Sequence, residues 1–123
     1  MATAAAEQEL CEIIRAAATM VPEASSLVHR CRTEEQPRQE LAVACGRVAP
    51  AYFVLRERVR DLASTPQTKH AEQLLNFQQQ ILEQASMLAF RPRDGHWQDL
   101  ARRLGEDTSA PAEELLRLCQ EAT

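Results

Sequence analysis

The residues of this chain that could carry out chemistry are few and lie far apart. His29, His70 and His96 have no partner at the spacing of a metal site, and no Gly-rich phosphate loop or G-x-S-x-G motif occurs. The carboxylate pair Glu113-Glu114 falls at a predicted helix start, where negative charge favours the helix dipole. We therefore expect no enzyme activity, no catalytic residue, no cofactor and no metal.

The four cysteines are widely spaced and contain no C-x-x-C pair. Cys31 and Cys45 fall on apolar helix patterns, which predicts small, reduced core residues; a disulfide between facing helices is the less favoured alternative. The first residues lack the features of a signal peptide, and no stretch approaches the roughly 20 apolar residues of a membrane span. These observations predict a cytoplasmic or nuclear protein.

The net charge of −4 argues against a general nucleic-acid binder, which is usually basic. Arg56, Arg58 and Arg60 lie close together, but Glu57 and Asp61 dilute them, as on a solvated helix face. We expect no direct nucleic-acid partner.

The elements that must carry these residues are helices. Two segments keep the 3-4 spacing of a coiled-coil a/d seam for about three heptads each. The first seam contains Leu10, Ile13, Ala17, Met20, Ala24, Leu27 and Cys31, and the second contains Leu41, Cys45, Val48, Tyr52, Leu55, Val59 and Leu62. A third helix is predicted from about Pro66, after the cap Ser64-Thr65, to Phe90. Its pattern is widened by Leu75, Phe77 and Leu82, which indicates contact with two neighbours.

Prolines complicate the two seams. Pro22 and Pro50 each fall at heptad position f, which points away from the partner helix. Each proline either kinks its helix on the solvent side or starts a new short helix, and the kink is the favoured alternative.

The chain changes character after the turn at Arg91 to Gly95. A short helix is predicted through Trp97, Leu100 and Leu104, with Gly105 at its C-terminal cap. A last helix is predicted to start at Pro111. The predicted fold is therefore all-α: a helical hairpin or three-helix bundle with heptad seams over residues 1–93, plus a short C-terminal two-helix appendage over residues 94–123.

One short segment has a familiar pattern. Residues 97–105, WQDLARRLG, carry W-x-x-L-A-x-x-L-G and resemble one helix of the death domains. The resemblance covers about nine residues and implies a fold of six short helices and a role in signalling assemblies.

The predicted function is that of a non-enzymatic helical interaction protein, a small structural or adaptor subunit of a larger intracellular multiprotein complex. An Ala on a seam buries less apolar surface than a Leu would and contributes roughly 1.5–3 kcal/mol less to stability. We therefore expect the chain to gain stability from other helical subunits. A hetero-oligomer is expected rather than a homo-oligomer. The alternative is a self-contained death-fold-like signalling adaptor module, with an enzyme a distant third. Trp97 is expected either to anchor an interface or to close the chain's own core. The residues expected to contact a partner are Leu10, Ile13, Met20, Leu27, Leu41, Val48, Tyr52, Leu55, Val59, Leu62, Trp97, Leu100 and Leu104.

Overall fold

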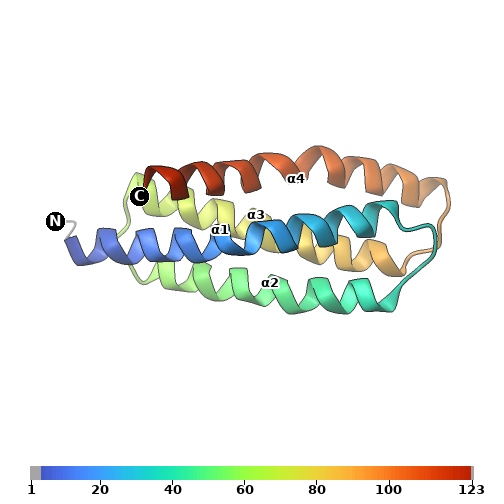
Figure 1. Ribbon diagram of the computed structural model, residues 1–123, viewed down its shortest axis with the longest axis horizontal. Helices are drawn as coiled ribbons and strands as arrows, with labels where there is room; N and C mark the ends of the chain where they lie inside the picture. The colour runs from blue at the N-terminus through green and yellow to red at the C-terminus, as the bar shows by residue number, and fades with distance from the viewer. Residues whose placement is uncertain (1–3, 123) are drawn as a thin grey trace.

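The computed structural model describes residues 4–122, apart from the side chains of residues 107 and 108. Within these residues the chain forms four helices and no strand, which confirms the all-α prediction. The helices are α1 (Ala4–Thr33), α2 (Gln39–Arg60), α3 (Pro66–Phe90) and α4 (Gly95–Glu121). Figure 1 shows them running up and down in alternation, joined by the short turns 34–38, 61–65 and 91–94.

The helices form a four-helix bundle. Each helix packs on the next in chain order, α4 packs back on α1, and α1 also contacts α3 across the bundle, whereas α2 and α4 lie on opposite sides (Figure 1). The prediction of a hairpin or three-helix bundle with an appendage differs from this architecture. Side chains from all four helices share one core, so the boundary predicted at residue 93 falls in a turn within a packed unit.

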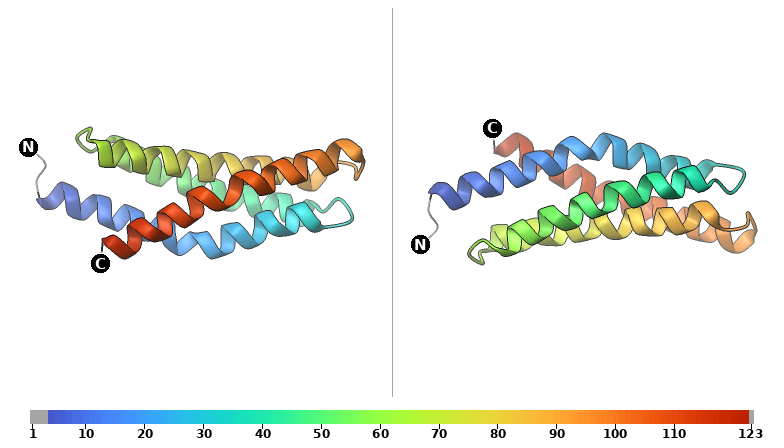
Figure 2. Two further views of the ribbon diagram at one scale, coloured as in Figure 1. Left: turned by 90° about the horizontal axis from the view of Figure 1, so that it is seen from above. Right: turned by 90° about the horizontal axis from the view of Figure 1, so that it is seen from below.

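Both predicted seams are buried inside the chain's own bundle. Leu10, Met20, Val48 and Leu62 are half-buried, and the other ten seam residues are buried. The helices also run through both prolines, whose side chains are exposed as position f requires. Figure 2 shows α1 bent near its middle, where Pro22 removes a backbone donor.

Small seam residues allow α2 and α3 to approach closely. Ser86 Oγ on α3 donates to the carbonyl of Ala42 on α2 at 2.9 Å. Cys45 and Ala49 on α2 and Ala85 on α3 are buried in the same core. The Ala-rich seams are thus closed within the chain, and no partner is required to cover them.

The C-terminal segment is the largest departure from the sequence prediction, because one continuous helix replaces the two-helix appendage. Gly105 does not adopt a positive φ, so it does not end the helix. It makes room for Arg32 of α1, whose Nε donates to the carbonyl of Ala101 at 2.7 Å. The apolar pattern then continues beyond Pro111 to Leu115, which is fully buried. Gly105 and Pro111 locally favour a helix break, but packing against α1 and α3 stabilises α4 as one continuous helix.

Trp97 lies in the core of the bundle. Its Nε1 donates to the carbonyl of Leu88 at 3.0 Å, and the guanidinium of Arg93 lies 4.4 Å from the ring centroid. The same Arg93 guanidinium donates to four backbone carbonyls, those of Glu34, Gln36, Leu88 and Arg91. Arg93 thus joins the α1–α2 turn to the α3–α4 turn. The helix that carries the death-domain pattern is the last of four long helices, and the six short helices implied by that resemblance are absent from residues 4–122.

Candidate protein-interaction site

Most of the residues predicted to contact a partner lie in the bundle core. Eight of them are buried: Ile13, Leu27, Leu41, Tyr52, Leu55, Val59, Trp97 and Leu104. The remaining five are half-buried: Leu10, Met20, Val48, Leu62 and Leu100. Another protein could reach the buried set only if the helices separated. Leu100 and Leu104 differ from the others because they also line a hollow that opens on the surface.

That hollow is one part of a groove between α3 and α4. Two adjoining hollows of about 170 and 470 Å³ share Gln84 and make up what we call the α3–α4 groove. The hollow near the α3–α4 turn is lined by Gln84, Met87, Leu88, Arg91, Leu100 and Leu104. The hollow nearer the middle of α4 is lined by Phe77, Gln80, Ile81, Gln84, Glu106, Ala110 and Pro111.

The α3 wall of the groove is a second helical stripe beside the core stripe. Phe77, Gln80, Gln84 and Met87 follow one another at 3, 4 and 3 residues, so they share one face of α3, and Arg91 lies directly after the end of the helix. Phe77 is 40% exposed and Met87 is 66% exposed. Two glutamines interrupt the apolar pattern of this stripe. The sequence therefore predicts Phe77 as part of a widened core-facing stripe and does not single out Met87. The continued 3-4 spacing was the signal that could have identified the stripe.

The α4 wall supplies Leu100 and Leu104 at one end and small side chains at the other. Ala110 and Pro111 project little from the helix, so the groove stays open beside Phe77. The groove is therefore apolar on its floor, with glutamine amides along the α3 side.

Two cations stand at the turn end of the groove. Arg91 lines the hollow there. Arg103 is exposed and is not itself a lining residue, but it lies three residues after the lining residue Leu100, about one turn further along α4. No carboxylate among the described residues pairs with either guanidinium, whereas Glu106, in the other hollow, faces Arg102 at 3.4 Å. The turn end of the groove is thus positively charged, and its middle is not.

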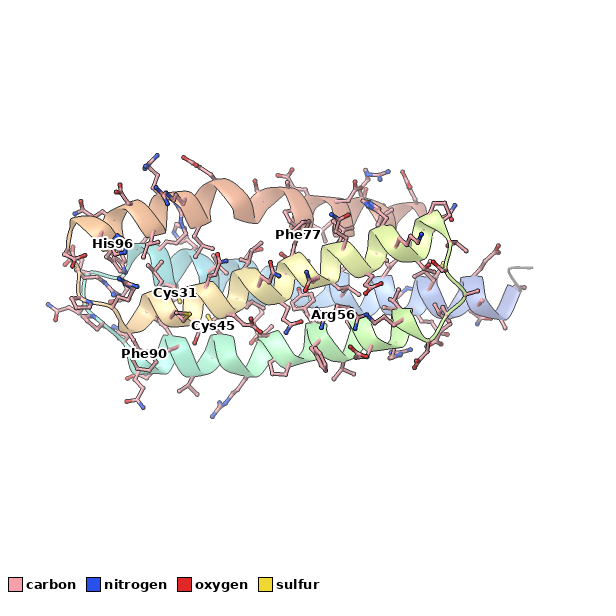
Figure 3. All side chains as sticks on the ribbon, turned by 180° about the vertical axis from the view of Figure 1, so that it is seen from behind. Cys31, Cys45, Arg56, Phe77, Phe90 and His96 are labelled. Carbon is pink, nitrogen blue, oxygen red and sulfur yellow. The ribbon has the colours of Figure 1, made fainter. Side chains whose placement is uncertain are left out.

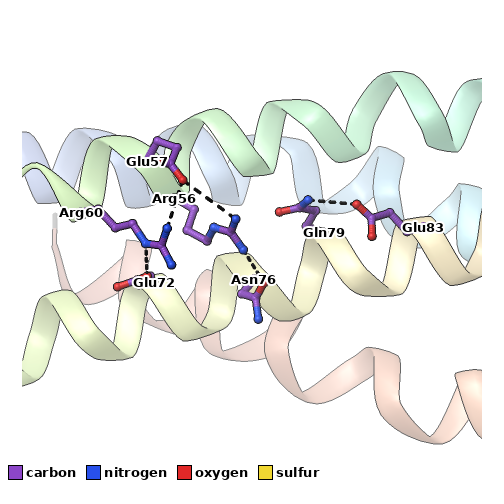
Figure 4. Close-up of polar contacts among 7 residues, drawn as sticks. All are labelled: Arg56, Glu57, Arg60, Glu72, Asn76, Gln79 and Glu83. Atoms are coloured by element: carbon purple, nitrogen blue, oxygen red, sulfur yellow. Dashed lines mark hydrogen bonds and ion pairs between the residues drawn. The ribbon is translucent and has the colours of Figure 1, made fainter.

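Elsewhere on the surface, a cluster of polar side chains on α2 and α3 pairs within the chain. Figure 4 shows Arg56 of α2 donating to Asn76 of α3 at 2.5 Å and Arg60 contacting Glu72 at 2.5 Å. These residues line a hollow of about 500 Å³, but their polar groups already pair with one another, so they are less available to a partner than the apolar side chains of the groove. Exposed apolar residues also occur on α2, where Val43 and Val54 lie on one face of the helix.

No group of three or more metal-binding side chains gathers among the described residues. His29 and His96 are exposed and His70 faces Glu114 at 3.5 Å, so the three histidines lie apart. None of the four helices, as far as the structure describes them, is long and apolar enough to cross a membrane.

No protein-family model matches this chain, and it matches neither a curated protein nor a solved structure.

Proposed function

We propose that this protein is a non-enzymatic helical interaction module, an adaptor or small subunit that binds another protein through the α3–α4 groove in the cytoplasm or nucleus. The observation that carries the proposal is the exposure of two large apolar side chains, Phe77 and Met87, along one groove between α3 and α4. Fully burying a large apolar side chain contributes roughly 1.5–3 kcal/mol, and a partner that covers the exposed parts of Phe77 and Met87 gains a corresponding fraction without opening the core. The flexible Met side chain also adapts to the shape of a partner.

The dimensions of the groove suit a helix. Phe77 and Arg91 are 14 residues apart, which corresponds to about 21 Å at 1.5 Å per residue. A partner helix of three to four turns has about that length, and helices commonly bind by laying an apolar face into such a groove.

The lining residues also favour binding over catalysis. The polar side chains in the groove are glutamines, Arg91 and Glu106, and no cysteine, serine or histidine lies among the lining residues. The only carboxylate among these lining residues, Glu106, already pairs with Arg102 at 3.4 Å, so no nucleophile–base pair is assembled by the lining residues.

Site-specific photo-cross-linking in the native cell tests the proposal. A photoreactive phenylalanine is placed at position 77 or 84 in the groove, and at position 54 on the outer side of α2 as an exposed control. We expect the two groove positions to cross-link the same protein and position 54 to miss it. Cross-links from position 54 alone, or none from the groove, would contradict this function.

A further inference from the structure

The charge at the turn end of the α3–α4 groove identifies the kind of helix that fits it. We propose that the groove binds an amphipathic helix that places acidic residues over Arg91 and Arg103 and an apolar face against Phe77, Met87 and Leu100. This inference rests on the proposed function and names the chemistry of its partner.

The first step concerns the two cations themselves. Most other exposed arginines of the bundle already face a carboxylate: Arg58 contacts Glu9, Arg60 contacts Glu72, and Arg117 contacts Glu114. Arg91 and Arg103 have no such partner among the described carboxylates; Arg15, Arg30 and Arg47 share this property, but they lie on α1 and α2, away from the groove. In a chain whose net charge is −4, two unpaired cations beside an apolar hollow leave a local positive charge at that hollow.

The second step concerns direction. Glu106 lies in the hollow away from the turn and already pairs with Arg102, so the cations without a described carboxylate partner lie only at the turn end of the groove. A helix with acidic residues at only one end satisfies this arrangement in a single orientation. Placed the other way round, its carboxylates would lie beside the Arg102–Glu106 pair and leave Arg91 and Arg103 without a partner.

The third step concerns spacing. Met87 and Phe77 on α3 are 10 residues apart, which corresponds to about 15 Å along the helix. Apolar partner residues at i, i+4, i+7 and i+11 extend over about 16 Å and reach both hollows. An acidic residue one turn beyond the Met87 end then lies near Arg91, directly after the end of α3.

The experiment selects binding peptides against the full chain. The probe is a displayed library of helical 20-residue peptides with Leu fixed at i, i+4, i+7 and i+11 and with both flanks randomised. We expect selection to enrich Asp and Glu on one flank only. The double variant Arg91→Glu, Arg103→Glu should weaken the acidic peptides about tenfold and shift selection toward Lys and Arg on that flank.

A matched control separates local from general electrostatics. Arg47→Glu changes an exposed cation on α2, away from the groove, and should leave the selected flank unchanged. An equal effect of Arg47→Glu would show that the acidic preference reflects overall charge, and this would overturn the proposal. Circular dichroism of each variant checks that the bundle stays helical.

The outcomes distinguish the two proposals. If the enriched peptides have no acidic flank but their binding is lost in the Phe77→Asp variant, the acidic-helix inference is overturned. The groove then remains a binding site. An absence of enriched peptides, or enrichment that Phe77→Asp does not affect, would count against both. Sedimentation that shows a dimer sensitive to Phe77→Asp would identify a second copy as the occupant and overturn the inference as stated.

Discussion

Cys31 and Cys45 face each other across the α1–α2 interface with 3.6 Å between their sulfur atoms, and both side chains are fully buried (Figure 3). Both are free thiols, in agreement with the prediction of small, reduced core residues. Their hydrogen bond and their burial raise the pKa of the Cys45 thiol above its ordinary value. The thiolate is the reactive form, so Cys45 is protected both by packing and by protonation. The same hydrogen bond lowers the pKa of the Cys31 thiol, so Cys31 is protected by packing alone.

The four cysteines should therefore react in two classes. Cys11 and Cys119 are half-buried, and we expect a maleimide to label them in the folded protein. Cys31 and Cys45 should be labelled only in denaturant or at the rate of global unfolding. Mass spectrometry of peptides after timed labelling measures both classes. Equal native-state labelling of all four would contradict the packed α1–α2 interface.

Tyr52 predicts how stability changes at alkaline pH. Burial raises the pKa of its phenol to about 12, while the unfolded chain titrates near the ordinary value of about 10. The unfolded state therefore loses its proton first as the pH rises. The contribution of Tyr52 is fully present below about pH 10, and about 2–3 kcal/mol is lost between about pH 10 and 12.

Urea unfolding as a function of pH measures this loss, and absorbance of the phenolate follows the only tyrosine in the chain. Tyr52→Phe serves as the control. It should cost about 1 kcal/mol at neutral pH, because the amide of Gln78 loses its acceptor at 3.5 Å, and should flatten the alkaline decline. A phenolate transition near pH 10 in the folded protein would show that Tyr52 is solvated.

Neighbouring residues on α2 test the seam. Leu55 is buried, whereas Val54 is 55% exposed. Leu55→Asp should cost about 3–5 kcal/mol, since it places an unpaired carboxylate in the core, and Val54→Asp should change stability by about 0.5 kcal/mol at most. Thermal unfolding followed by circular dichroism compares them. Similar small effects would mean that the seam does not face the core.

Arg32 and Gly105 should be coupled. A Cβ added at Gly105 would lie 1.9 Å from Nη2 of Arg32, so the guanidinium must move and lose its bond to the carbonyl of Ala101. Gly105→Ala should stabilise an Arg32→Ala background by about 1 kcal/mol through helix propensity and give little or no gain in the parent. Denaturant unfolding of the four proteins measures the coupling, and full additivity would contradict the contact.

Arg93 should be hard to replace. Its guanidinium donates to carbonyls from two turns and lies over the ring of Trp97, a geometry that an ammonium group cannot reproduce. Arg93→Lys should cost roughly 2 kcal/mol and shift the fluorescence of the only tryptophan. Arg91→Lys is the control with unchanged stability, because no described side chain bonds to its guanidinium. Equal stabilities of the two variants would contradict this role.

The sequence alone determined the helical class, the first three helices and the buried residues of both seams. These predictions were possible because buried residues on a helix recur with a period of 3.6 residues, and this period is visible in the order of apolar residues along the sequence. Heptad position f likewise predicted that Pro22 and Pro50 point to solvent. Of the two alternatives that the sequence left open at each proline, the structure has the favoured one, a helix that continues through it.

Only the tertiary structure decided that the seams close within one chain, that Trp97 serves the core, and that α4 is a single helix through Gly105 and Pro111. Local signals at these two residues predict helix ends, but burial of Leu104 and Leu115 against α1 and α3 stabilises the helix across them. The α3–α4 groove also depended on tertiary structure. A groove exists only where two helices are placed side by side, and residues as distant as Phe77 and Ala110 meet in it only once the bundle has formed.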